Sequence, residues 1–354
     1  MRLVPETMRV SVLERPGELV LRERPVPAPG AGQVLVRVRS VGVCGSDVHY
    51  FEHGRIGDFV VRQPLVLGHE VSGVIAAVGP GIDGGRVGSR VAIEPGAACG
   101  TCGPCKAGRY NLCPDMRFFA TPPVDGALAE YVCVRADLAY DLPASVSDDA
   151  AALLEPLSVG IWATGKAGVT VGDSVLIAGA GPIGLVTTQL ARARGATTIV
   201  VTDIAPDRLA AARRHGATEA VLAGDGPAGD GPAGDGLAGA GPADGFDAFI
   251  DCSGAPAAIG AGVRSLRPAG VAVLVGMGPD ELTLPFALLQ QRELTITGTF
   301  RYANTWPAAI ALAASGAVDV DALVTDRYPL AEAARALAAT RQPGTIKSVI
   351  EPWR

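Results

Sequence analysis

The stretch S-V-L-I-A-G-A-G-P-I-G at residues 174–184 decides the fold of the chain. Its first five residues, 174–178, form a compact apolar run that predicts a buried strand. A helix is expected to follow from Pro182 to Arg194. A strand, a glycine-rich turn and a helix in this order are typical of the first unit of a dinucleotide-binding fold.

The three glycines of this stretch have distinct physical tasks. Gly179 permits a tight turn, Gly181 lets the backbone approach a pyrophosphate, and Gly184 allows the helix to pack closely against the strand. The N–H groups and the positive dipole at the start of the helix then favour an anion. A lone glycine pattern is a weak signal, so the prediction depends on its position between a strand and a helix. The cofactor contacts expected here also include Pro182 and Ile183.

A carboxylate follows the next predicted strand. The apolar run 198–202 ends at Asp203, at the distance from the glycines where such folds carry a ribose-binding acid. A carboxylate there accepts hydrogen bonds from the adenosine ribose diol and repels a 2′-phosphate, so NAD is predicted rather than NADP. Two alternatives stay open. Asp203 could cap the helix that opens at Pro206, and Arg208 could lie against the adenosine or assist a phosphate.

Strands alternate with helices throughout the middle of the chain. Further strands are expected over 246–251 and 270–275, and helices over 206–215 and 257–266. This alternation predicts an α/β fold with a parallel sheet.

The first third of the chain has a different sequence pattern, which predicts strands without intervening helices. Valine-rich runs punctuated by glycine and proline predict strands over 8–12, 33–41 and 71–78. From about residue 300 the chain returns to short strands and one or two alanine-rich helices.

Four cysteines are gathered in one glycine- and proline-rich loop. The spacing C-x2-C-x2-C-x7-C allows four thiolates to surround one point, as tetrahedral zinc requires. A redox pair would need only two cysteines, and an iron–sulfur cluster usually has other spacings. We predict a structural zinc held by Cys99, Cys102, Cys105 and Cys113.

A second set of metal-ligating residues is dispersed along the chain. Cys44 lies in V-G-V-C-G-S-D-V-H, and His69 and Glu70 lie in V-L-G-H-E. Taken singly, Cys44 could be a buried thiol and His69 a core histidine with its hydrogen bonds satisfied. Together they match a zinc site with an open position, which is the form that catalysis requires.

Composition excludes several classes of protein. Hydrophobic residues are 48% and charged residues 19% of the 354 residues, which is ordinary for a globular chain of about two domains. The net charge of −6 lacks the excess of positive charge that is typical of nucleic-acid-binding proteins. Residues 1–20 contain no apolar run, and glycines interrupt the uncharged stretch 174–191, so we expect neither a signal peptide nor a membrane span. A cytoplasmic protein is expected.

Taken together, the glycine motif and the two predicted metal sites resemble those of the zinc-dependent medium-chain dehydrogenases, over nearly the whole chain. The chain resembles the polyol branch in particular, which includes sorbitol and xylitol dehydrogenases. G-H-E at 68–70 belongs to the wider superfamily. The more specific stretches are H-G-R-I-G-D-F at 53–59, A-T-P-P at 120–123 and F-R-Y-A-N-T-W-P at 300–307.

The resemblance implies two domains. A β-rich GroES-like catalytic domain would comprise residues 1–156 and 298–354, with a zinc lobe at about 95–115. A Rossmann domain with a doubly wound parallel sheet would comprise residues 157–297.

The resemblance also implies roles for single residues. Cys44, His69 and Glu70 would bind the catalytic zinc with water as the fourth ligand, and Glu155 would act on that water or exchange into the metal shell. The relay of the alcohol proton to solvent would use Ser46 and His49. The polyol pocket would be lined by Tyr50, Phe118, Glu155, Arg301 and Tyr302, and the nicotinamide side by Val275, Gly276, Met277, Thr299, Phe300 and Arg301.

From the residues alone, some of these positions have plainer interpretations. Phe118 and Tyr302 would be core aromatics, His49 an exposed turn histidine, and Glu155 a carboxylate at a helix start.

The chain departs from the family at residues 224–243. Imperfect five-residue copies such as G-D-G-P-A stand where the family usually has a helix. Glycine and proline at this density cannot form a helix or a core, so a mobile surface loop is expected, with inert expansion favoured over a binding linker.

The implied reaction is the reversible oxidation of a polyol to a ketose with NAD, using one catalytic and one structural zinc per subunit. Dehydrogenases of L-threonine or of simple secondary alcohols share the zinc and NAD motifs, so these two activities remain alternatives. A zinc-free, quinone-reductase-like dinucleotide-binding protein is a further alternative. Such a protein should lack both the set of Cys44, His69 and Glu70 and the four-cysteine lobe. The family implies a homotetramer or a dimer, with an edge strand near 271–275 or 295–300 pairing between subunits. The preferred polyol is left open.

Overall fold

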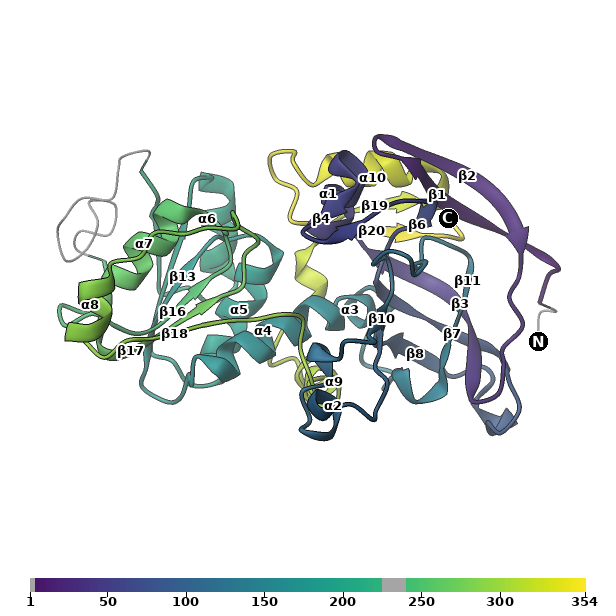
Figure 1. The fold of residues 1–354 in the computed structure, drawn as a ribbon, viewed down its shortest axis with the longest axis horizontal. Coiled ribbons are helices and arrows are strands. Elements are labelled where there is room, and N and C mark those ends of the chain that lie inside the picture. Colours follow the sequence, from purple (N-terminus) through teal and green to yellow (C-terminus); the bar gives the residue numbers. More distant parts are fainter. Residues whose placement is uncertain (1–3, 225–239) are drawn as a thin grey trace. The chain divides into compact units, whose positions relative to one another are not determined.

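The computed structural model describes residues 4–224 and 240–354, which form two compact units (Figure 1). One unit comprises Met1–Glu155, Trp306–Ala314 and Val320–Arg354, and the other comprises Pro156–Thr305 and Ser315–Asp319. Most of the predicted loop at 224–243 lies outside the described residues.

The first unit is built on a mainly antiparallel seven-stranded sheet. Valine and leucine dominate its central strand, and Val34, Val36 and Val38 have no exposed surface. β-Branched side chains fit such a pleated, buried surface well. The strand order is β12 (Ala139–Asp141), β8 (Arg90–Ile93), β7 (Glu70–Val78), β3 (Gln33–Gly42), β20 (Lys347–Glu351) and β19 (Val324–Pro329), with β11 (Tyr131–Arg135) also paired to β3.

Smaller elements complete the first unit. A three-stranded sheet contains β2 (Glu18–Pro25), β1 (Thr7–Arg15) and β6 (Leu65–Val66), and two short ladders pair β4 (Arg55–Ile56) with β5 (Phe59–Val60) and β9 (Gly96–Ala97) with β10 (Arg117–Phe118). Its helices are α1 (Gly45–His53), α2 (Gly103–Lys106), α3 (Asp148–Ala152), α9 (Trp306–Ser315) and α10 (Ala333–Ala339). The strands predicted in the first third of the chain are confirmed.

The ends of three strands meet at one end of the main sheet. β3 runs antiparallel to both β7 and β20. Gly42, the last residue of β3, therefore pairs with Glu70, the first residue of β7, and also with Val349 of β20. Residues that follow β3, or that begin β7 and β20, converge here.

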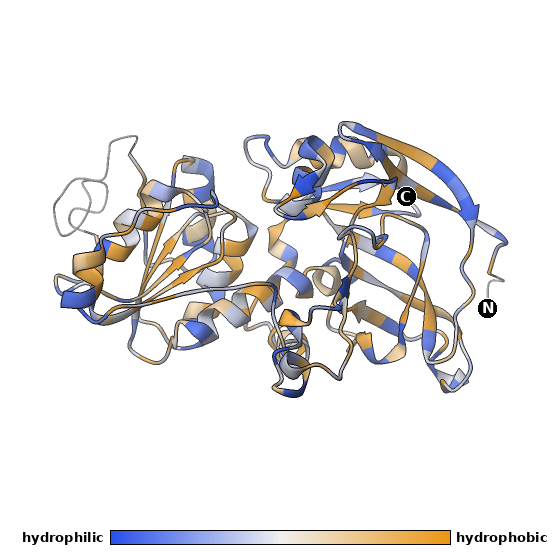
Figure 2. Cartoon of the chain, in the orientation of Figure 1, coloured by the Kyte–Doolittle hydropathy of each residue, from blue (hydrophilic) through white to orange (hydrophobic). Residues whose placement is uncertain are grey.

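The second unit contains a six-stranded parallel sheet. Its strand order is β15 (Glu219–Leu222), β14 (Thr198–Asp203), β13 (Ser174–Ala178), β16 (Phe246–Asp251), β17 (Leu266–Leu274) and β18 (Thr295–Gly298). The helices are α4 (Leu154–Lys166), α5 (Pro182–Ala193), α6 (Pro206–Arg214), α7 (Pro256–Arg264) and α8 (Phe286–Gln291). Figure 2 shows the central strands of this sheet as mainly hydrophobic, and Val175, Leu176 and Phe249 are at most 1% exposed.

The strand order identifies where a ligand is expected. The chain first extends the sheet from β13 through β14 to β15 and then returns to add β16 on the other side of β13. Open parallel sheets bind ligands beyond the carboxyl ends of the strands at this reversal. The predicted strand at 174–178 and the helix that follows it are confirmed, and so is the α/β fold class.

Of the two segments expected to provide an edge strand, the one near 295–300 does and the one near 271–275 does not. β17, which contains residues 271–274, lies between β16 and β18 and is therefore not an edge strand. β18 is the edge strand on this side.

In the part of the chain that the structure describes, no helix combines the length and the apolar character needed to cross a bilayer.

Candidate functional site

Three metal-ligating side chains meet at the end of the first unit's sheet. A sulfur of Cys44, a ring nitrogen of His69 and a carboxylate oxygen of Glu70 all lie within 4.8 Å of one another. Cys44 follows β3 closely, while His69 and Glu70 stand at the beginning of β7, so the converging strand ends bring them together. His69 and Glu70 are buried and Cys44 is half-buried. Sulfur, imidazole nitrogen and carboxylate oxygen are ligands that zinc accepts in proteins.

The carboxylate of Glu70 is placed as a cation ligand would be. Its Oε1 accepts a 2.6 Å hydrogen bond from Nζ of Lys347, whereas its buried Oε2 has no hydrogen-bond partner among the described residues. An unsatisfied buried acceptor costs about 1–3 kcal/mol, and more when charged, so a bound cation would remove an existing penalty. A Cβ at Gly42 would lie 1.9 Å from Oε2, so glycine is needed to leave this space. The residues therefore fit a zinc ion.

Lys347 is a site residue that sequence reasoning missed. Its side chain is 3% exposed, and its Nζ also donates to the carbonyl of Val43 at 2.7 Å. Burial opposes the charge, but the pKa of Lys347 is raised by Glu70, Cys44 and Glu155, which keeps the ammonium form. No motif links residue 347 to residue 70. The pairing of β20 with β3 brings them together.

Asp47 is the second residue that sequence reasoning missed. It is 2% exposed and accepts hydrogen bonds from the backbone N–H groups of Cys44 at 3.1 Å and Gly68 at 3.0 Å. One of its oxygens lies 3.6 Å from Nδ1 of His69. Such a carboxylate orients an imidazole and leaves the other ring nitrogen for a metal. Its position in the first turn of α1, where an acidic residue commonly caps a helix, is the signal that could have found it.

Asp47 and His69 stabilise each other's charged forms, and a zinc ion bound by His69 would take the place of the second ring proton. Burial works against both charged forms, yet the pKa of Asp47 is lowered by His69 and by the two backbone donors. The pKa of His69 is raised well above its ordinary value because the charges of Asp47 and Cys44 outweigh burial.

Two more predicted residues of the first unit lie in reach of this cluster. Phe118, at the end of β10, is buried with its ring centroid 5.7 Å from that of His69. Glu155, in the first turn of α4, is 5% exposed and contributes to the raised pKa of Lys347.

Helix α1 carries the remaining predicted residues of this unit. Tyr50 is buried, Ser46 is half-buried and His49 is exposed. Ser46 and His49 are three positions apart on one helix, which places them on a common face.

The four predicted lobe cysteines form a compact cluster. Their sulfur atoms lie within 4.8 Å of one another, and those of Cys99 and Cys105 are 3.9 Å apart, close to the ~3.8 Å that tetrahedral Zn–S bonds of ~2.3 Å require. Hydrogen bonds from the side chain and backbone of Thr101 and from the backbone of Cys102 lower the pKa of Cys99 to about 6. All seven cysteines of the chain are free thiols.

A buried carboxylate connects this lobe to the main sheet. Glu94, 3% exposed, accepts hydrogen bonds from the hydroxyls of Tyr110 at 2.7 Å and Tyr140 at 3.0 Å. Tyr140 stacks on Trp306 with ring centroids 5.5 Å apart. Burial raises the pKa of Glu94 despite these hydrogen bonds.

In the second unit, the glycine motif forms the turn between β13 and α5. Gly179 has φ of 93°, a conformation that other residues rarely adopt. A Cβ at Gly184 would lie 1.8 Å from the carbonyl oxygen of Gly179, whereas one at Gly181 would meet nothing within 4 Å. The turn is therefore tight, and the space beside Gly181 stays open.

Asp203 joins two turns at the carboxyl edge of the sheet. Its carboxylate accepts hydrogen bonds from the backbone N–H of Ala180 at 2.7 Å and of Ala205 at 2.9 Å. The bond to Ala180 ties it to the glycine motif, so it does more than precede helix α6. Arg208 is half-buried on α6, and Ile204 is an exposed apolar residue, 76% exposed, that sequence reasoning missed.

The residues predicted for the nicotinamide side follow β17 and β18 at the same edge. The N–H groups of Val275 and Gly276 donate to the carbonyl of Asp251 at 2.9 and 3.0 Å, and that of Thr299 donates to the carbonyl of Leu274 at 2.9 Å. These bonds fix the course of both loops.

The side chains of the predicted residues in these two loops differ in solvent exposure. Met277 and Phe300 are exposed, the Arg301 guanidinium lies 4.8 Å from the centroid of the Phe300 ring, and Tyr302 is buried.

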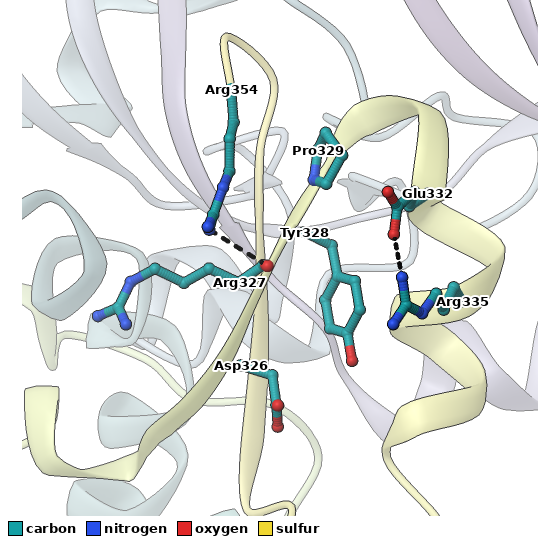
Figure 3. A pocket seen from close by; sticks show the side chains of 7 residues that line it. All are labelled: Asp326, Arg327, Tyr328, Pro329, Glu332, Arg335 and Arg354. Atoms are coloured by element: carbon teal, nitrogen blue, oxygen red, sulfur yellow. Dashed lines mark hydrogen bonds and ion pairs between the residues drawn. The ribbon is translucent and has the colours of Figure 1, made fainter.

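A separate hollow of about 460 Å³ lies in the first unit beside β19 and α10 (Figure 3). Its charged groups are engaged with one another or with neighbours, since Arg335 pairs with Glu332 at 2.8 Å and Arg327 pairs with Asp149 at 2.7 Å. It contains none of the predicted site residues. The lining residues are Asp326, Arg327, Tyr328, Pro329, Glu332, Arg335 and Arg354.

Comparisons with known proteins agree with this arrangement. The family model described as Alcohol dehydrogenase GroES-like domain matches residues 30–144, and the one described as Zinc-binding dehydrogenase matches residues 182–315. Sorbitol dehydrogenase of Gallus gallus is 46% identical over 96% of this chain and 95% of its own length. Sorbitol dehydrogenase of Bos taurus is 45% identical over 98% and 96%.

Solved structures share the fold as well. A protein described as a short chain alcohol dehydrogenase from E. coli CFT073, in complex with NADH, superposes with a TM-score of 0.90 at 31% identity, over 98% of this chain and all of that one. The structure also contains the two groups of potential metal ligands, Cys44/His69/Glu70 and Cys99/Cys102/Cys105/Cys113. The chain therefore belongs to the zinc-dependent medium-chain dehydrogenases, within the polyol dehydrogenase family.

Proposed function

We propose that this protein is an NAD-dependent dehydrogenase that uses zinc to oxidise a secondary alcohol of a polyol to the ketone. The observation that carries this function is the cluster of Cys44, His69 and Glu70, in which one buried carboxylate oxygen lacks a hydrogen-bond partner among the described residues. Relatives named sorbitol dehydrogenase, 46% and 45% identical to this chain, support a polyol as the substrate class.

Cys44, His69 and Glu70 would hold the catalytic zinc, and the four lobe cysteines would hold the structural one. Zinc at the first site supplies a Lewis acid that lowers the pKa of the substrate alcohol. The chain prepares this site in advance. Asp47 orients the imidazole of His69, while Lys347 holds one oxygen of Glu70 and leaves the other free.

The alcohol proton needs an acceptor and a path to solvent. The Glu155 carboxylate is buried, and its charge helps to raise the pKa of Lys347. We therefore assign it as the first acceptor of the alcohol proton. The hydroxyl of Ser46 and the imidazole of His49 provide a second path, because Ser46 is half-buried, His49 is exposed and both lie on one face of α1.

NAD, when bound, accepts the hydride from the substrate carbon. The open space at Gly181 and the start of α5 would receive the pyrophosphate, and Asp203 would accept hydrogen bonds from the ribose diol. The exposed apolar surface of Ile204 would lie against the adenine. The loops at 275–277 and 299–301 would contact the nicotinamide.

Polyol recognition would depend on polar side chains. A site built to hydrogen-bond hydroxyls can reject analogues that lack them by roughly 10⁴-fold. We propose that Tyr50, Phe118 and Glu155 of the first unit, and Arg301 and Tyr302 of the second, contact the polyol.

We further propose that the enzyme is a homotetramer, or a dimer, in the cytoplasm. β18 is the last strand of the parallel sheet in the second unit, and one of its sides has no partner strand within the described chain. Such an edge strand can pair with a strand of another copy, which supports assembly. The four clustered cysteines of the lobe, none of which forms a disulfide, suit a reducing compartment.

The substrate class is tested by initial rates of NADH formation at neutral to mildly alkaline pH. Sorbitol, xylitol, ribitol, L-threonine and 2-butanol are compared, with NADP as the control cofactor. The expected result is a clear preference for one or more polyols with NAD. Dominance of L-threonine or 2-butanol would overturn the polyol assignment while keeping the zinc and NAD sites.

A further inference from the structure

A buried carboxylate at the carboxyl edge of the parallel sheet has no part in the sites described above. Asp251 is the last residue of β16 and has no exposed surface. Its Oδ1 accepts hydrogen bonds from the backbone N–H of Ser253 at 3.0 Å and from the hydroxyl of Ser253 at 2.7 Å. Its Oδ2 accepts one from the N–H of Gly254 at 3.1 Å. A buried charge needs such donors, and here they hold the turn at 252–254 against the carboxylate.

The main chain of the same residue holds a second loop, at 275–278. The carbonyl oxygen of Asp251 accepts hydrogen bonds from the N–H groups of Val275 at 2.9 Å and Gly276 at 3.0 Å. Both donors belong to the residues predicted for the nicotinamide side. Asp251 therefore joins the turn at 252–254, through its side chain, to the loop at 275–278, through its backbone.

The turn and the loop also touch each other directly. Gly254 has φ of 70°, and a Cβ there would lie 2.1 Å from the carbonyl oxygen of Met277. A Cβ at Gly276 would lie 2.1 Å from the backbone nitrogen of Gly254, and one at Gly278 would lie 2.6 Å from its carbonyl oxygen. The glycines let the two backbones approach this closely, so a shift of the turn must displace the loop.

We propose that Asp251 is a positioning residue for the nicotinamide end of the cofactor site. Its carboxylate fixes the turn at 252–254, and the turn in turn supports the loop at 275–278. The turn is less closely packed against the glycine motif, because a Cβ at Gly179 would lie 3.1 Å from the backbone nitrogen of Ser253. Asp251 thus acts on the nicotinamide loop rather than on the pyrophosphate turn. This role rests on the proposed function, in which that loop contacts the nicotinamide.

The test compares the binding of NADH and of ADP-ribose to zinc-loaded Asp251→Asn by calorimetry. ADP-ribose has the adenosine and the pyrophosphate of the cofactor but no nicotinamide. If the amide oxygen of the variant faces Ser253, its NH₂ group meets the N–H of Gly254, and two donors oppose each other. We expect NADH to bind about tenfold more weakly, as the loss of a hydrogen bond to a charged group predicts, and ADP-ribose to bind unchanged.

The same strand offers a matched control. Asp247, near the start of β16, likewise accepts hydrogen bonds from the backbone N–H and the hydroxyl of one serine, Ser174, at 2.8 and 2.6 Å. Asp247→Asn removes a comparable charge at the opposite edge of the sheet and should leave both affinities unchanged. Ser253→Ala is a milder second variant, because it keeps the carboxylate and removes only the hydroxyl donor. It should weaken NADH binding by a smaller factor than Asp251→Asn and leave ADP-ribose binding unchanged.

Two results would overturn the role of Asp251. One is an unchanged NADH affinity in both Asp251→Asn and Ser253→Ala. The other is an equal loss of affinity for NADH and ADP-ribose, which would show that the turn supports the glycine motif or the whole unit instead. Failure of the proposed function would be recognised separately, because the unsubstituted protein would then not bind NADH, and the positioning role would fall with it.

Discussion

Nζ of Lys347 lies 2.6 Å from Oε1 of Glu70, and the two side chains are 3% and 1% exposed. This buried ion pair joins the first residues of β20 and β7 across the end of β3. It occupies one oxygen of the carboxylate and leaves the other, Oε2, without a hydrogen-bond partner in the described part of the chain. Lys347 is thus a positioning residue for the proposed zinc ligand.

Lys347→Met is expected to destabilise the zinc-free protein far more than the zinc-loaded one. Removing one partner of a buried ion pair costs about 3–5 kcal/mol, because the other charge stays buried and unpaired. A zinc ion beside Glu70 would offset much of that cost. Thermal unfolding of both variants with and without zinc measures the difference, and Lys347→Arg should recover part of the stability. Equal losses in the two metal states would refute this role for Lys347.

Gly42→Ala is expected to displace the Glu70 carboxylate. The added Cβ would lie 1.9 Å from Oε2 and 3.0 Å from the carboxyl carbon, so the carboxylate must move. We expect loss of zinc from this site and of turnover, with the lobe zinc retained, as measured by zinc per chain. Gly84→Ala is the matched control in the same unit, since its Cβ meets nothing within 4 Å. Two zinc ions per chain in Gly42→Ala would contradict the assignment of Glu70.

Asp203→Asn is expected to relax the preference for NAD over NADP. The amide oxygen can still accept a hydrogen bond from one of the two turn N–H groups, which bond to different oxygens of Asp203, but the negative charge that repels a 2′-phosphate is lost. Charge-assisted hydrogen bonds contribute about 1.5–3 kcal/mol, so the ratio of kcat/KM for the two cofactors should change by roughly tenfold or more. Asp203→Ala should in addition loosen the glycine turn that the carboxylate holds. An unchanged ratio in both variants would remove Asp203 from the cofactor site.

Glu94→Gln is expected to change the pH dependence of stability. Burial raises the pKa of Glu94 above its value in the unfolded chain, so its charged form is disfavoured in the folded protein. The resulting penalty is absent at pH values below the unfolded pKa and grows as pH rises through the folded pKa. The variant cannot ionise, so its stability relative to the unsubstituted protein should improve between acidic and neutral pH. Denaturant unfolding at several pH values checks this, and a difference independent of pH would contradict the assignment.

Features carried by short, continuous stretches of sequence were predicted well. The glycine turn at 179–184 depends on neighbouring residues, and so does the loop that holds Cys99 and Cys113, so local spacing was sufficient for both. The start of β17 was predicted less well, because a register shift near Phe246 lets the strand begin already at Leu266.

Features that depend on strand pairing could not be predicted from local spacing. Lys347 stands 277 residues from Glu70 and reaches it only because β20 and β7 both pair with β3. The need for glycine at position 42 likewise follows from its pairing with Glu70. Asp47 had a local signal at the start of α1, but its contact with His69 required the fold.

The most direct test of the zinc-dependent reaction compares Cys44→Ser with the unsubstituted enzyme in sorbitol-dependent NADH formation. NADH binding is followed in parallel by its fluorescence, and zinc per chain is measured for both proteins. We expect the variant to keep the lobe zinc and its NADH affinity, to lose the second zinc, and to have no measurable turnover. Full turnover by a variant that lacks this zinc would show that the reaction does not depend on it.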